Sequence, residues 1–150
     1  SDLLTGKAEL RNAWVQPLSD TDHAKIISHW SEESLVEGGK IYNSLCITCH
    51  GTPTQEGSMP TSRHFQREPF KNGSDPFRQF QTLTQGYGLM MPMPMFTPEQ
   101  RYAALHYIRE TFVAPHNKGE LFKIDHGMIE QIEANFISVP YHMPSPWDAA

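Results

Sequence analysis

Basic residues are scarce in this chain. Its 150 residues include 12 Lys and Arg against 17 Asp and Glu, and the net charge is −5 with histidine neutral. Nucleic-acid binding needs clustered basic side chains that neutralise phosphates, whereas the densest basic group here is the scattered set Arg63, Arg67 and Lys71. We therefore exclude a nucleic-acid partner.

Long apolar runs are also lacking. No stretch approaches the roughly 18 apolar residues that a membrane-spanning helix requires, so we expect no transmembrane segment in this chain. We also find no strand pattern, internal repeat or low-complexity segment. The chain begins Ser1-Asp2-Leu3, without Met or a charged and apolar leader, and we expect a mature or excised segment.

The apolar fraction is low for one domain. Hydrophobic residues make up 38% and charged residues 19% of the chain, and the charged share is below the usual quarter. A chain of this length builds a single core. We therefore expect a prosthetic group to fill part of the interior.

Only two cysteines are present, and they lie in Cys46-Ile47-Thr48-Cys49-His50. This is the attachment signature of a c-type haem. Thiols three residues apart lie on about one helical turn and can reach the same porphyrin edge, and His50 is then carried under the iron as the proximal ligand. A single motif predicts a single covalent haem c.

Three other uses of the cysteines fit the sequence less well. A thioredoxin-like pair would lie near a βαβ pattern and open a helix, whereas this pair closes one. A structural zinc site needs four ligands, and no third cysteine exists. A disulfide would close a very tight loop and leave His50 unexplained.

Capping signals and periodicity predict several helices. One helix is capped by residues 19–22 and runs to about Trp30, and another carries Gly38, Tyr42 and Cys46 at a spacing of four. A short helix begins after Asp75, and the clearest runs from Thr97, its N-cap, to about Phe112, with Ala104 on the face expected to cross Gly38. Asp125 is expected to cap a last helix with Met128, Ile129 and Ile132 inward, before a Pro-rich, linker-like tail at 139–147.

The attachment motif, the methionine-rich loop and the last helix resemble a class I cytochrome c domain over residues 35–113. The resemblance implies an all-α fold with three core helices around a covalent haem. Residues 1–34 then form an N-terminal extension with a helix, and residues 114–150 form a C-terminal extension and tail. In this family a Gly and an aromatic residue, matched by Gly38 and Tyr42, let the first and last helices cross closely.

The resemblance also implies the sixth iron ligand, a methionine on the loop before the last helix. The candidates are Met90, Met91, Met93 and Met95, which lie seven, six, four and two residues before Thr97. The family spacing favours the first two, and the Gly-x-Gly-x-Met pattern that ends at Met90 makes it our prediction. Met91, which begins a Met-Pro pair, is the alternative. A further alternative makes all four methionines packing residues, with a histidine such as His64 ligating instead.

Further site residues follow from the same resemblance. Segment 57–60 is similar to a family loop that offers a backbone carbonyl to the second ring nitrogen of the proximal histidine, and Pro60 is the candidate. Tyr87 and Arg63, with Arg67 and Lys71, are candidates for the haem propionates.

The expected function is electron transfer through one haem c with His/Met ligation, and no catalysis by this domain alone. Residues 107–110, 115–117 and the Pro-Ser-Pro-Trp end resemble haem c domains fused to larger periplasmic proteins in planctomycete-type bacteria. This implies an exported location and either a separate redox partner protein or a fused catalytic domain as partner. The alternative is a haem enzyme or gas sensor with a labile sixth ligand.

Overall fold

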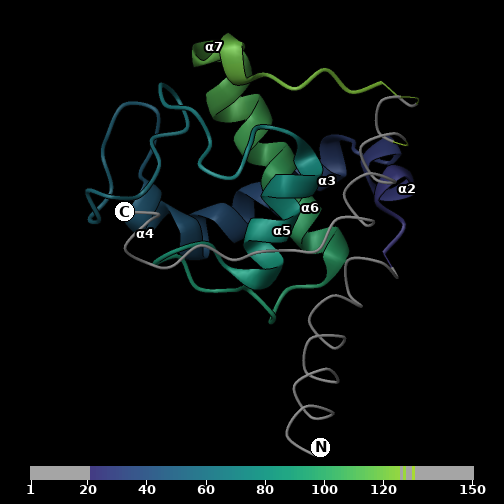
Figure 1. Ribbon diagram of the computed structural model, residues 1–150, viewed down its shortest axis with the longest axis horizontal. Helices are drawn as coiled ribbons and strands as arrows, with labels where there is room; N and C mark the ends of the chain where they lie inside the picture. The colour runs from purple at the N-terminus through teal and green to yellow at the C-terminus, as the bar shows by residue number, and fades with distance from the viewer. Residues whose placement is uncertain (1–20, 126, 128–129, 131–150) are drawn as a thin grey trace, which may run out of the picture.

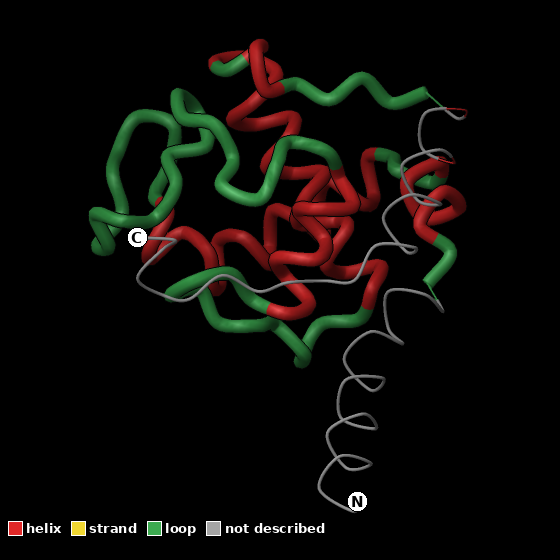
Figure 2. The backbone as a smooth tube through the Cα atoms, in the orientation of Figure 1, coloured by secondary structure: helices red, strands yellow, loops and turns green. Residues whose placement is uncertain are grey.

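The computed structural model describes residues 21–125, 127 and 130. Its helices, seen in Figures 1 and 2, are α2 (His23–Ser28), α3 (Glu32–Ile41), α4 (Ile47–His50), α5 (Pro76–Gln85), α6 (Pro98–Ile108) and α7 (Ala114–His116). Within the described residues, β pairing is limited to an isolated bridge between Tyr87 and Met90. The predicted all-α fold is confirmed.

Local signals start the helices where the sequence predicts. The carboxylate of Asp75 accepts the backbone N–H of Arg78 at the start of α5. Thr97 and Gln100 form a capping box at the start of α6, so two otherwise unpaired backbone N–H groups are satisfied. The inward residues expected of a helix after Asp125, and the Pro-rich tail, lie outside the described residues.

The cysteine motif lies at the end of one long helical rod. A π-helical segment, Tyr42–Cys46, joins α3 to α4, and the rod ends after His50 at Gly51, which has a φ of +75°. The Tyr42 hydroxyl donates to the Gly51 carbonyl at 2.6 Å. This hydrogen bond joins the π-helical segment to the residue that ends the rod, next to the cysteine motif. A second π-helical segment, Arg109–Val113, joins α6 to α7, and a short 3₁₀ turn follows at Lys118–Glu120.

Helices α3 and α6 share the most extensive contact between helices of the described chain (Figure 1). A Cβ at Gly38 would overlap the carbonyl oxygen of Ala103 and lie 3.0 Å from Cβ of Tyr107. The predicted crossing at Gly38 is confirmed, but Ala103 rather than Ala104 faces it. The contact is made by the Ala103 backbone, which side-chain periodicity does not reveal.

Two hydrophobic clusters form the core. One consists of Tyr42, Phe65, Ile108, Phe112 and Val113, and the other of Ile27, Phe77, Phe80, Leu83, Tyr102 and Leu105. The second cluster includes residues of α2, whose His23 is fully buried and hydrogen-bonded through Nδ1 to the Tyr102 hydroxyl at 2.5 Å. Helix α2 is therefore part of the core.

We predict that Gly38→Ala lowers the free energy of unfolding by roughly 2–3 kcal/mol, the upper range for an overpacked position. Alanine gains about 1 kcal/mol of helix propensity over glycine, but the clash is with backbone and cannot relax by a rotamer change. Denaturant unfolding measures the difference. Gly119→Ala is the matched control, because an added Cβ there has no atom within 4 Å; equal midpoints for the two variants would contradict the close crossing.

Candidate functional site

A cavity of about 340 Å³ opens between the two core clusters. This volume is within the range of small-molecule and cofactor sites. Phe65 and Ile108 line it from one cluster, and Leu83 and Leu105 from the other. Segments 45–50, 59–73 and 87–93 supply most of the remaining wall. The structure therefore keeps a mainly apolar space where side chains alone do not fill the core.

The predicted attachment residues Cys46, Cys49 and His50 all line this cavity and are half-buried. The two cysteines are not joined in a disulfide. Burial, with a smaller contribution from neighbouring Cys49, raises the pKa of Cys46 to about 11. The two sulfurs are thus presented from one helical turn toward the same space.

His50 is oriented by two contacts. Its Nδ1 lies 3.0 Å from the carbonyl oxygen of Arg63, and its ring stacks on Phe65 with the centroids 4.5 Å apart. Burial lowers the pKa of His50, and the hydrogen bond to the Arg63 carbonyl opposes this shift. Because Nδ1 must donate to a carbonyl, the neutral ring keeps Nε2 as the free lone pair, which is the tautomer that an iron ligand needs.

The sequence-based prediction that Pro60 supplies the hydrogen-bond acceptor for the His50 ring is wrong, because the acceptor is the Arg63 carbonyl. Gly57 packs its backbone against the carbonyl of Cys49, and the backbone N–H and hydroxyl of Ser58 both donate to the Thr48 carbonyl. This packing holds the start of the loop against α4 and leaves Pro60 in an exposed turn. The chain returns to the imidazole only three residues later, at Arg63.

Phe65 was not identified from the sequence. It is 7% exposed and contacts His50, Phe70 and Phe112. The signal in the sequence that could have identified Phe65 is an apolar aromatic residue within an otherwise polar loop segment.

Three of the four candidate methionines, Met90, Met91 and Met93, line the cavity, and Met95 does not. The main chain of Met90 is fixed in a tight turn, since Tyr87 and Met90 exchange backbone hydrogen bonds of 3.1 and 3.0 Å. Two glycines make this turn possible: Gly88 has a φ of +60°, and Gly86 has a φ of +81° with its Cα against the Met90 carbonyl. Both are conformations that favour glycine.

Two predicted polar residues, Tyr87 and Arg63, also line the cavity, together with Lys71. The Tyr87 hydroxyl donates to the Lys71 carbonyl at 3.3 Å. Among the described residues, the buried Nε of Arg63 has no hydrogen-bond partner. Arg67, by contrast, pairs with Glu56 at the surface and does not line the cavity.

These donors fit a covalently attached haem c. Two thiols on one helical turn suit its two vinyl groups, and a neutral imidazole follows them directly. The apolar wall suits the macrocycle, and thioether side chains and an unpartnered guanidinium nitrogen are available in the same cavity. The donor types that a haem c requires are therefore gathered around one cavity.

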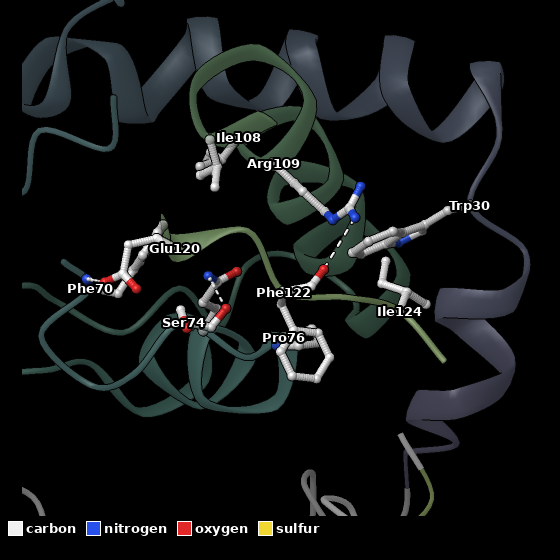
Figure 3. Close-up of a pocket in the computed structure, with 11 residues that line it drawn as sticks. Trp30, Phe70, Ser74, Pro76, Ile108, Arg109, Glu120, Phe122 and Ile124 are labelled. Carbon is white, nitrogen blue, oxygen red and sulfur yellow. Dashed lines mark hydrogen bonds between the residues drawn. The ribbon is translucent and has the colours of Figure 1, made fainter. Parts of the chain in front are cut away.

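A second cavity, shown in Figure 3, lies among Trp30, Phe70, Arg109, Glu120 and Ile124. Arg109 donates to the Phe122 carbonyl at 3.2 Å, and the Glu120 carboxylate accepts the Phe70 N–H at 2.9 Å. Its volume is only about 10 Å³, which is room for at most one water. We interpret it as a packing seam.

The described part of the chain contains no helix that is both long and apolar enough to cross a membrane. No curated protein and no solved structure matches the sequence significantly. Residues 33–108, half of the chain, match the family model described as cytochrome c oxidase, cbb3-type, subunit III. That match covers α3 from its second residue, the cysteine motif, α5, the methionine loop and α6. The chain therefore belongs to this family of class I c-type cytochrome domains, which bind haem c covalently and transfer electrons.

Proposed function

We propose that the chain transfers electrons through one haem c whose axial ligands are His50 and Met90, as a module of a larger exported oxidoreductase. The observation that carries the ligand assignment is that Cys46, Cys49, His50 and Met90 all line the same apolar cavity. His64, the alternative ligand, does not line it. A histidine opposite His50 is therefore less well supported than a thioether.

Met90 is better supported than its neighbours. It is half-buried and packs against the core cluster of α5 and α6, and its main chain is fixed by the glycine turn. Met91 has 72% of its surface exposed. Met93 also packs on the cluster, and its backbone N–H is bound to the Leu83 carbonyl at 2.7 Å, but it lies only four residues before Thr97, which is short of the family spacing.

The ligand pair determines the chemistry. With imidazole and thioether ligands, neither oxidation state has to bind or lose a ligand. The thioether favours the ferrous state and raises the reduction potential. The half-buried imidazole is oriented by the Arg63 carbonyl and Phe65, which limits ligand rearrangement further.

Arg63, Lys71 and Tyr87 are proposed to bind the haem propionates. All three line the cavity, and the two cations are close enough that Arg63 contributes to lowering the pKa of Lys71, after burial as the main cause. The Nη1 of Arg63 is 3.4 Å from Glu68, and its buried Nε, which has no partner among the described residues, is a donor available for an anion. Carboxylates here would offset the mutual repulsion of the two cations.

The partner is proposed to be a fused catalytic domain or a separate redox protein in the periplasm or an equivalent exported compartment. The resemblance of residues 107–117 to haem c domains fused to larger periplasmic proteins supports this context. Transient redox contacts are small and weak, so we expect docking through a limited surface near the cavity mouth.

Covalent attachment is tested by acid-acetone extraction of the holoprotein. Each thiol adds across a vinyl group, so both sulfurs become thioethers and the colour should stay with the protein. Free thiols should not titrate. In Cys46→Ala/Cys49→Ala, any colour retained before extraction should move to the solvent. Release of haem from the wild type would overturn the attachment assignment.

The sixth ligand is tested by single substitutions in the methionine loop. Met90→Ala should abolish the sulfur-to-iron charge-transfer band of the oxidised protein and lower the reduction potential, because the thioether is lost. Met93→Ala and Met95→Ala should retain the band and serve as matched controls. If Met91→Ala is the only variant that loses the band, the ligand is Met91 and not Met90.

Carbon monoxide separates an electron carrier from an enzyme or gas sensor. The visible spectrum of the reduced wild type should not change on addition of the gas, because both axial positions are filled. Reduced Met90→Ala should bind it. Rapid, complete binding by the wild type would favour a haem enzyme or sensor with a labile sixth position.

A further inference from the structure

One side chain, that of Arg101, forms hydrogen bonds at both ends of the methionine loop, residues 86–96. Arg101, on the first turns of α6, donates from Nη1 to the Thr84 hydroxyl at 2.5 Å and from Nε to the Phe96 carbonyl at 3.0 Å. Thr84 lies at the end of α5, just before the loop, and Phe96 is the last loop residue. A single guanidinium therefore bridges the two points between which the loop runs.

Burying the guanidinium of Arg101 has a desolvation cost. It is 7% exposed, and a buried charge is expensive unless it is well paired. The four ion pairs found among the described residues involve other side chains. The contacts of Arg101 are instead neutral: a hydroxyl, a carbonyl and the face of Phe80, whose ring centroid is 5.0 Å from the guanidinium carbon. A planar group with several donors suits this bridging role, which a lysine cannot reproduce.

Backbone hydrogen bonds also shape the described loop. Gly86 donates to the Thr82 carbonyl, Tyr87 and Met90 form the tight turn, Met93 donates to the Leu83 carbonyl, and Phe96 donates to the Met93 carbonyl. These bonds anchor the start and the middle of the loop on α5, but none of them joins α5 directly to Phe96. If the two ends separate, Met90 gains conformational freedom, and holding its sulfur at a fixed point becomes entropically more costly.

We propose that Arg101 is a positioning residue that clamps the methionine loop and thereby sets how firmly Met90 holds the sixth coordination position. The proposal rests on the assignment of Met90 as ligand. Arg101 does not line the cavity, so it acts through the loop and not by contact with the haem.

The test compares four holoproteins: wild type, Arg101→Leu, Thr84→Val and Arg78→Leu. Arg101→Leu removes both bridging bonds, whereas Thr84→Val removes one and leaves the arginine in place. Arg78→Leu is the matched control, because Arg78 is an exposed arginine of α5 that pairs with Asp75. We measure the charge-transfer band against temperature, carbon monoxide binding to the reduced protein, and amide hydrogen exchange of residues 86–96, with helical circular dichroism as the measure of the global fold.

In Arg101→Leu, the charge-transfer band should be lost well below the temperature at which helicity is lost, and the equilibrium constant for releasing the thioether should rise about tenfold or more, as expected for lost bonds to a charged donor. Carbon monoxide binding and loop amide exchange should accelerate by a similar factor. Thr84→Val should show a smaller change of the same sign. Arg78→Leu should behave as wild type.

The outcomes separate the two proposals. If the wild type lacks the band, the ligand assignment fails irrespective of the clamp. If the wild type has the band but Arg101→Leu and Thr84→Val lose it only with global helicity, with unchanged loop exchange, the clamp is overturned while the ligand assignment stands. If Arg101→Leu does not fold, Thr84→Val decides the question alone, because its volume is conserved and one bond remains.

Discussion

The close approach of α3 and α6 at Gly38 is the constraint on which the site depends. The rod that begins with α3 ends in Cys46–His50, and α6 directly follows the methionine loop. With the Gly38 backbone against the Ala103 carbonyl, two segments that are distant in sequence are held in one fixed relation. A larger side chain at the crossing would move the cysteine motif relative to the loop, and the two halves of the site would no longer share a cavity.

The two proposed axial ligands are held by different physical means. His50 is oriented locally, by a backbone carbonyl and an aromatic ring from the segment that follows it. The loop of Met90 depends on two glycines with positive φ and on a guanidinium bridge between its ends. An imidazole is rigid, so fixing its ring plane suffices. A methionine has a long, rotatable side chain, and its position is only as well defined as its backbone.

The sequence predicted the features that local chemistry determines. Capping residues placed the starts of α5 and α6, and the cysteine spacing identified the attachment turn. It did not identify residues whose role arises from contacts distant along the chain. The Pro60 prediction failed because packing of Gly57 and Ser58 on α4 delays the return of the loop to His50. Arg101 reads as an ordinary surface charge of an amphipathic helix, and only the folded chain shows it buried between Thr84 and Phe96.

Helix α2 lies before the first residue of the family match, yet His23 and Ile27 are among the most buried residues of the protein. The boundary of family similarity and the boundary of the folding unit therefore do not coincide. A fragment trimmed to residue 33 would leave Phe77, Phe80 and Tyr102 with an uncovered aromatic face and would be prone to self-association. A fusion protein that uses this domain in another electron-transfer system must therefore include α2, because this helix covers the core.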